Sequence, residues 1–506
     1  MPRILRNIIF NLIGQGTLLV LGFVAVRFVY RGLGEDALGI IYFALAASSV
    51  ISMMLDLGIG SSAIREVSSR VSSEPEYITD FVRTGSLFSW GMYALLALII
   101  YFAVPAIVSH WIKLAALNPE TATHVLRVVG IAALVALPRT LYVGILRGLQ
   151  RMEFNNVIDV VVSALQQLGM IAILIGGGDL SRVVHWLAFC YLASIAAYIA
   201  TCARLLSRRA ILPGFSMTVV KRNFSFASHM ATSSVLSIIE SQADKAIISK
   251  LLPIGMFGYY GVAYTAVSKS MLISGSIADA VLPSLCELHG VGDRKALLSQ
   301  YSKLHDMLCF VMIPVFAFIL FAAPPVFTYI LNIDAARLLL VPTALLCLGF
   351  YLNSTLQAPH MFSLAAGRPD IAARFNLYAL FAVPPTAVVL IHFFGLMGAG
   401  FSWAVYNLLY YLYAIPRICG ECELGIKPLK LYGHVARFLG LGVVTYGLAW
   451  TICRTAGQGS VTFLAVGYVL ASLVFLYASF LLIGPDLRST LQGLLGTLRA
   501  KYVEVF

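Results

Sequence analysis

The sequence predicts an all-α polytopic membrane protein with about fourteen transmembrane helices, and two observations support this fold class. The first is composition: 60% of the 506 residues are hydrophobic, 11% are charged and the mean hydropathy is +0.88. Soluble domains average roughly 25% charged residues, and one soluble core could not bury so much apolar surface. The second observation is a series of apolar runs, each near the length of about 20 residues that crosses a bilayer as a helix.

Fourteen such runs follow one another along the chain. They cover residues 8–30, 38–58, 87–107, 125–146, 157–175, 183–206, 224–248, 256–282, 308–327, 338–364, 375–392, 398–415, 438–453 and 461–483. The first run is too long for a cleaved signal peptide and lacks a small-residue cleavage site before the next run. We therefore expect it to remain as the first transmembrane helix.

The basic residues indicate the orientation. When the N-terminus is placed in the cytoplasm, 24 of the 35 Lys and Arg residues fall on the cytoplasmic side and 7 on the opposite side. Cytoplasmic loops of membrane proteins carry an excess of Lys and Arg, so the split predicts an even number of crossings with both termini in the cytoplasm. The same scattered distribution argues against nucleic-acid binding despite the net charge of +12, because a nucleic-acid site gathers its basic residues on one face.

Two pairs of short segments indicate an internal repeat. Segment 31–39 resembles segment 250–258, and Gly39 and Gly258 are separated by 219 positions; Gly148 and Gly367 have the same separation. Short glycine-rich matches can arise by chance, but the shared offset favours duplication. It predicts two six-helix lobes of parallel topology, a plan typical of alternating-access transporters.

The predicted lobes cover residues 1–210 and 211–425. Residues 426–506 would add two further transmembrane helices and a cytoplasmic tail.

The loops favour a transporter over an enzyme. The longest non-cytoplasmic loops lie near 111–123 and 328–337, carry few acids and leave little room for catalytic groups. No G-x-x-x-x-G-K-[ST] segment is present, so the chain has no nucleotide-binding loop of that type. Cys419 and Cys422 form a C-x-x-C pair without two further ligands nearby, so we expect free thiols and no metal site.

Several charged residues fall within or near the apolar runs, where an ionisable group is costly and usually faces a cavity. Glu240 and Asp244 are four residues apart and share one helix face; the cations are Arg27, Lys245 and Lys269. One interpretation is a structural ion pair of Asp244 with one of the lysines. The other is a polar cavity whose cations attract an anionic head group such as phosphate. Arginine suits this role because its planar guanidinium can bind two phosphate oxygens at once.

Five segments together resemble the Wzx-type polysaccharide flippases of the multidrug/oligosaccharidyl-lipid/polysaccharide exporter superfamily. They are residues 31–39, 56–65, 146–151, 244–260 and 365–368, and the resemblance covers roughly residues 1–420. It implies two six-helix lobes that form a V opening alternately to each side of the membrane. It also implies transfer of undecaprenyl-pyrophosphate-linked oligosaccharides from the cytoplasmic to the periplasmic leaflet of a bacterial inner membrane.

The resemblance also implies roles for individual residues. Arg27, Lys245 and Lys269 would line the upper cavity. Four arginines would bind the head group at the cytoplasmic mouth: Arg65, Arg147, Arg151 and Arg368. Their alternative role is to set the topology of the chain in the membrane. Whether a proton or sodium gradient drives transport stays open; Glu240 and Asp244 are the candidates for coupling, because a buried carboxylate near a base can change its protonation between states, and no cofactor is expected. Membrane lipids, a polysaccharide polymerase and a chain-length regulator are the expected partners.

Three alternatives stay open at this point. A multidrug or cation antiporter of the same superfamily relies on acidic residues in its first lobe, whereas residues 8–30 contain none. A lipid II flippase would share the fold and an anionic lipid cargo. A membrane-embedded polymerase would be a true enzyme.

Overall fold

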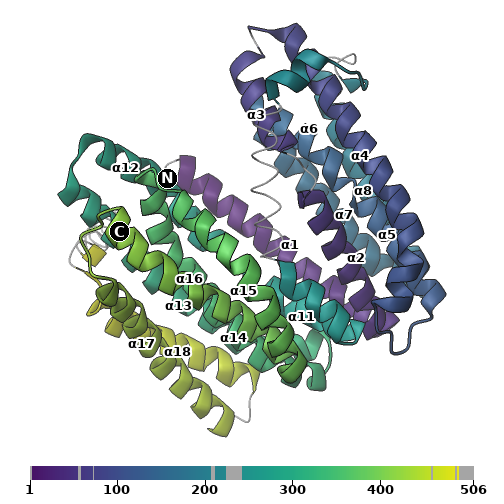
Figure 1. Ribbon diagram of the computed structural model, residues 1–506. Helices are drawn as coiled ribbons and strands as arrows, with labels where there is room; N and C mark the ends of the chain where they lie inside the picture. Colours follow the sequence, from purple (N-terminus) through teal and green to yellow (C-terminus); the bar gives the residue numbers. More distant parts are fainter. Residues whose placement is uncertain are drawn as a thin grey trace, which may run out of the picture. The chain divides into compact units, whose positions relative to one another are not determined.

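The computed structural model describes residues 3–54, 58–71, 73–206, 211–223, 242–456, 460–484 and 487–488, with side chains from residue 16 onward. Within these ranges the chain forms helices joined by short connections and no strand, apart from one isolated bridge between Lys113 and Pro253. The contacts divide the chain into two units, Met1–Gly261 and Val262–Phe506 (Figure 1). The predicted lobe boundaries at 210 and 425 remain predictions.

Eight complete helices belong to the described part of the first unit. They are α1 (Arg3–Leu33), α2 (Glu35–Met54), α3 (Ile59–Arg70), α4 (Pro75–His110), α5 (Pro119–Ala133), α6 (Ala136–Gly148), α7 (Met152–Ile175) and α8 (Leu180–Leu205). Helical segments at 217–223 and 242–251 and the beginning of α11 (Ile254–Ser268) follow.

Local sequence explains where these helices begin and how they pack. Asn118 accepts a hydrogen bond from the Glu120 backbone amide and Pro119 occupies the first turn of α5, a combination typical of helix starts.

The hydrophobic core of the first unit lies around Tyr142 of α6 and Tyr198 of α8, both fully buried.

The second unit contains the rest of α11 and seven further described helices. They are α12 (Met271–Val291), α13 (Arg294–Ile330), α14 (Ile333–Ala365), α15 (Asp370–Phe394), α16 (Leu396–Glu421), α17 (Pro428–Ala456) and α18 (Val461–Phe480). Helix α14 packs against α12, α13 and α16, whereas α17 and α18 lie side by side and pack on α13 (Figure 1). The two added C-terminal helices are therefore attached to the second unit through α13.

Twelve of the described helical segments are long and apolar enough to cross a membrane. Their large apolar side chains often face outward, as Phe102, Phe393 and Tyr477 do with 69%, 73% and 80% exposure, which fits a lipid environment. The predicted crossing at 224–248 lies mostly outside the described residues, and that at 398–415 forms α16, a 26-residue helix not among the twelve. The multi-pass membrane fold is confirmed, and the count of fourteen stays a prediction.

The repeat offset of 219 reappears in the helix boundaries. Helix α2 begins at Glu35 and α11 begins at Ile254, which are 219 positions apart. Gly39 and Gly258 touch: a Cβ atom on Gly258 would lie 2.9 Å from the Gly39 nitrogen, and one on Gly39 would overlap the Ile254 carbonyl oxygen. The close approach explains why both positions are glycine, because a side chain at either one would meet the facing backbone.

The second predicted match, Gly148 with Gly367, is wrong by two residues. The residue that adopts positive φ after α6 is Gln150, at 59°, and its equivalent after α14 is Gly367, at 70°. Each is followed by an arginine whose amide reaches five residues back, from Arg151 to Leu146 and from Arg368 to Ser363. The same helix ending is thus repeated at an offset of 217.

Candidate functional site

One cluster of polar contacts joins three segments of the first unit that are far apart in the sequence. Buried Asp36 accepts hydrogen bonds at Oδ2 from the backbone amides of Ala115, Ala116 and Leu117, at 2.6–2.9 Å. A carboxylate that accepts several backbone amides is strongly held. It anchors the start of α2 to the connection between α4 and α5.

The same connection also holds the segment that leads into α11. The Ile254 amide donates to the Lys113 carbonyl at 2.9 Å, and Lys113 Nζ donates to the Leu251 carbonyl at 2.8 Å. Trp111 Nε1 donates to Ser249 Oγ at 3.0 Å, and Lys250 donates to the His110 carbonyl. The starts of α2 and α11 are therefore both held by the connection between α4 and α5.

The predicted intramembrane residues of the first unit lie next to this junction in the chain. Asp244 is 8% exposed and accepts a hydrogen bond from the Tyr260 hydroxyl at 2.7 Å. Half-buried Lys245 donates to Gln242 Oε1 at 2.7 Å. Lys245 also interacts electrostatically with Asp244, and Arg27 is half-buried on α1. Two further predicted residues stand apart: Lys269 is exposed in the second unit, and Glu240 lies outside the described residues.

A further cation inside the first unit is neutralised by its surroundings. Arg139 of α6 forms an ion pair with Asp159 of α7, and the Tyr198 hydroxyl donates to the same carboxylate at 2.8 Å. The Arg139 guanidinium also lies over the Tyr198 ring at 5.2 Å. These contacts assign Arg139 to the packing of three helices.

Arg65, the first predicted residue of the mouth, belongs to an ion-pair network. It bonds to Glu66 at 2.6 Å and to Asn223 Oδ1 at 2.9 Å. Glu66 is only 1% exposed and also pairs with Arg70. Sequence reasoning missed this buried carboxylate, although its spacing of four residues from Arg70 on a helix is the pattern that could have found it.

The network continues toward the segment at 217–223. Glu74 pairs with Arg70 at 3.3 Å and with Arg222 at 3.0 Å. The hydrogen bond from Arg222 holds the pKa of the Glu74 carboxyl below its ordinary value of 4.5. Arg222 also lies over the Tyr77 ring at 4.5 Å. The network therefore ties the end of α3 and the start of α4 to the segment that follows α8.

Arg147 and Arg151, at the end of α6, are more accessible. Arg151 forms an ion pair of 3.3 Å with Glu153, and both side chains are more than half exposed. Arg147 is exposed, and within the described part of the chain no side chain bonds to it. Among the four predicted mouth arginines, Arg147 is therefore the one whose charge is available to a bound anion.

Arg368, the fourth predicted mouth residue, is bound to two carboxylates of the second unit. It donates to Asp370 Oδ1 at 2.8 Å and to Glu421, and these hydrogen bonds raise the pKa of its guanidinium. Glu421 also accepts from Arg374 at 3.0 Å and from Arg417 at 3.2 Å. This arrangement favours a structural role for Arg368, and it depends on partners up to 53 residues away that the sequence did not single out.

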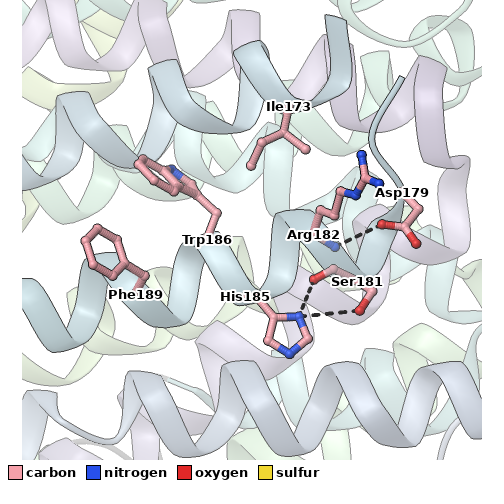
Figure 2. A pocket seen from close by; sticks show the side chains of 7 residues that line it. All are labelled: Ile173, Asp179, Ser181, Arg182, His185, Trp186 and Phe189. Atoms are coloured by element: carbon pink, nitrogen blue, oxygen red, sulfur yellow. Dashed lines mark hydrogen bonds between the residues drawn. The ribbon is translucent and has the colours of Figure 1, made fainter. Parts of the chain in front are cut away.

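A shallow depression on the outside of the first unit contains none of the predicted residues (Figure 2). It is lined by Ile173, Asp179, Ser181, Arg182, His185, Trp186 and Phe189. Its polar groups serve the start of α8: Asp179 Oδ1 accepts from the Arg182 amide at 3.0 Å, and His185 Nδ1 lies 2.7 Å from the Ser181 carbonyl. The Asp179 side chain therefore caps α8, and the His185 contact lies within the first turns of the same helix.

The eight cysteines are free thiols, including Cys419 and Cys422. Within the described ranges one group of metal-ligating side chains does come together, formed by His305, Cys309 and His434 of the second unit. The sequence offered only the four-residue spacing of His305 and Cys309, because His434 lies on a different helix.

The chain is similar in sequence to known proteins. Residues 4–289 match the family described as "Polysaccharide biosynthesis protein". A Shigella flexneri protein named "Putative O-antigen transporter" is 23% identical over 414 residues, which is 80% of this chain and 95% of that protein.

Two solved structures share the fold at low sequence identity. The lipid II flippase MurJ in an inward closed conformation has a TM-score of 0.70 and 14% identity, over 92% of this chain and 98% of its own. An inward-facing multidrug resistance MATE family transporter of the MOP superfamily has a TM-score of 0.64 and 17% identity, over 79% and 94%. The prediction of a transporter rather than an enzyme is confirmed. The chain is a multi-pass membrane transporter that belongs to the polysaccharide biosynthesis protein family.

Proposed function

We propose that this transporter flips undecaprenyl-pyrophosphate-linked oligosaccharide repeat units from the cytoplasmic to the periplasmic leaflet of a bacterial inner membrane. Both termini lie in the cytoplasm in this proposal. The lipid tail stays in the bilayer while the charged head group passes through a basic cavity. Support comes from the family match and from the relative named as an O-antigen transporter.

The charge of the membrane-embedded helices is the observation that carries the choice of cargo. Helix α1 contains four arginines and no acid, and Arg27 is half-buried on it. Cations in a poorly hydrated site attract phosphate strongly because little solvent screens them. A pyrophosphate head group suits this surrounding, whereas the cationic substrate of a drug exporter does not.

The coupling step and the partners belong to the same proposal. A carboxylate such as Asp244, held by the Tyr260 hydroxyl, is a candidate to exchange a proton or bind sodium between the two states of the cycle. Glu240 is the second candidate. A polysaccharide polymerase and a chain-length regulator would act on the delivered repeat units in the opposite leaflet.

Deletion of the gene followed by analysis of lipid-linked intermediates tests the cargo. We expect complete repeat units to accumulate on the cytoplasmic face and to disappear again when the wild-type chain is restored. Repeat units that already lie outside would indicate a polymerase and contradict the proposal. Accumulation of lipid II would indicate a lipid II flippase, and loss of dye export without a glycan defect would indicate a drug exporter.

Single substitutions test the role of charge. Arg27→Ala and Lys245→Ala should each impair glycan export at normal protein levels. Arg182→Ala is the matched control, because this arginine is exposed in the shallow depression of Figure 2 and lies outside the proposed pathway. Wild-type export from both test variants would rule out the basic cavity. Full export after removal of both Glu240 and Asp244 would dismiss the carboxylate-coupled step.

A further inference from the structure

A buried group of potential metal ligands lies where the two C-terminal helices meet the rest of the second unit. His305 and Cys309 are four residues apart on α13 and therefore share one face of that helix. His434 comes from α17. His305 is 3% exposed and Cys309 is fully buried. One donor atom from each of the three residues lies within 4.8 Å of the others.

A carboxylate stands beside the group and connects it to the end of α18. Asp306 Oδ1 lies 2.7 Å from His434 Nε2, and Oδ2 accepts a hydrogen bond from the Gly484 amide at 2.9 Å. Metal-binding histidines are commonly held by a neighbouring carboxylate, which orients the ring and makes it a stronger ligand. The negative charge also favours a cation in this buried place.

The polar atoms of the group are poorly satisfied by protein contacts. Within the described ranges, His305 Nε2 has no hydrogen-bond partner although the residue is almost completely buried. Its Nδ1 lies 4.0 Å from Cys309 Sγ, which is a weak contact at most. The Tyr301 hydroxyl, next to the His305 ring, also lacks a partner within those ranges. Buried polar atoms are normally paired, so the orphaned nitrogen points to a ligand.

We propose that His305, Cys309 and His434 bind a divalent transition metal of the zinc class. Two imidazoles and one thiolate are the donors that zinc prefers, with water or a further protein oxygen in the fourth position. Magnesium and calcium are excluded because they prefer oxygen ligands. The donors need to close by about 1 Å to reach tetrahedral zinc distances. The metal would hold α17 against α13, next to the Asp306 contact that holds the segment after α18.

Metal titration of the full-length chain in detergent tests this proposal. The background is Cys419→Ser/Cys422→Ser, so that the half-buried C-x-x-C pair cannot contribute. We expect about one equivalent of bound Zn²⁺ by elemental analysis. We also expect a thiolate-to-metal charge-transfer band with Co²⁺ in place of Zn²⁺, and a Tm that rises with metal concentration.

Matched variants assign the ligands. Cys309→Ser should abolish the charge-transfer band and weaken binding at least tenfold. Cys347→Ser, which removes another buried thiol of the second unit, should leave both unchanged. If Cys309→Ser does not fold, His434→Gln provides the same test at a partly exposed position. Metal content and spectra that are equal in Cys309→Ser, His434→Gln and the background would overturn the proposal, as would an absence of stoichiometric binding.

Discussion

The ends of α6 and α14 share one backbone design but use their arginines differently. In each, a residue with positive φ is followed by an arginine, Arg151 or Arg368, whose amide closes the helix. Each arginine then pairs with a carboxylate two residues further on, Glu153 or Asp370. This likeness fits the predicted repeat, at an offset of 217 rather than 219 residues.

The surroundings of the two arginines differ. Arg151 has a single exposed ion pair, and Arg147, one turn earlier, has no described side-chain partner. Arg368 is held by Asp370 and Glu421 in a network that includes Arg374 and Arg417. The comparison teaches that one repeat keeps an available positive charge at this helix end, whereas the other uses the same position to fasten α14, α15 and α16 together.

Removal of an arginine charge should give the largest difference between the two helix ends, measured as glycan transport. We expect Arg147→Ala to lower glycan transport about tenfold or more, because a charge-assisted hydrogen bond contributes about 1.5–3 kcal/mol. Arg368→Ala should change transport by no more than about threefold, since exposed ion pairs contribute little. Export measured at matched protein levels provides the test. Equal losses in the two variants would contradict the division of roles.

The residue with positive φ offers a smaller, structural test. Gly367→Ala should destabilise the second unit by about 1 kcal/mol, because a side chain is strained in the left-handed region. Gln150→Gly, at the equivalent position, should be neutral or slightly stabilising, since it relieves that strain. Thermal unfolding of the purified chain compares the two. A stabilising Gly367→Ala would show that the two helix endings are not equivalent.

The Glu421 network should show a dependence on salt. Glu421→Gln leaves three arginines facing a neutral amide, so we expect a small fall in Tm at low ionic strength that shrinks as salt is added. Glu153→Gln is the matched change at the other helix end and should have less effect, because it breaks one exposed pair. The prediction fails if the two variants respond alike to salt.

The pair between Glu74 and Arg222 should show the smallest effect, a dependence on pH. Its carboxyl has a folded-state pKa below the ordinary 4.5, so its stabilisation is present above about pH 4.5. It is lost as the pH falls through the lowered folded value. The Tm difference between wild type and Glu74→Gln should therefore vanish in acid. A difference that stays constant across this range would contradict the role of this ion pair.

The sequence by itself determined the membrane class and most crossings, and the internal repeat stays a prediction. Apolar runs and helix starts are local properties, because a helix in lipid satisfies its own backbone within one segment. The offset of 219 was visible because Gly39 and Gly258 can only be glycine where their helices touch. The second match was displaced by two residues because Gln150, rather than a glycine, takes the left-handed position.

Only the tertiary structure decided which charges are neutralised. Arg65, Arg147, Arg151 and Arg368 look alike in the sequence, yet Arg368 pairs with Glu421 53 residues away. Arg222 likewise pairs with Glu74 148 residues away. The group of His305, Cys309 and His434 was likewise invisible until α17 packed on α13. An ion pair or a metal site depends on distances between atoms, and packing between helices distant in the chain sets those distances.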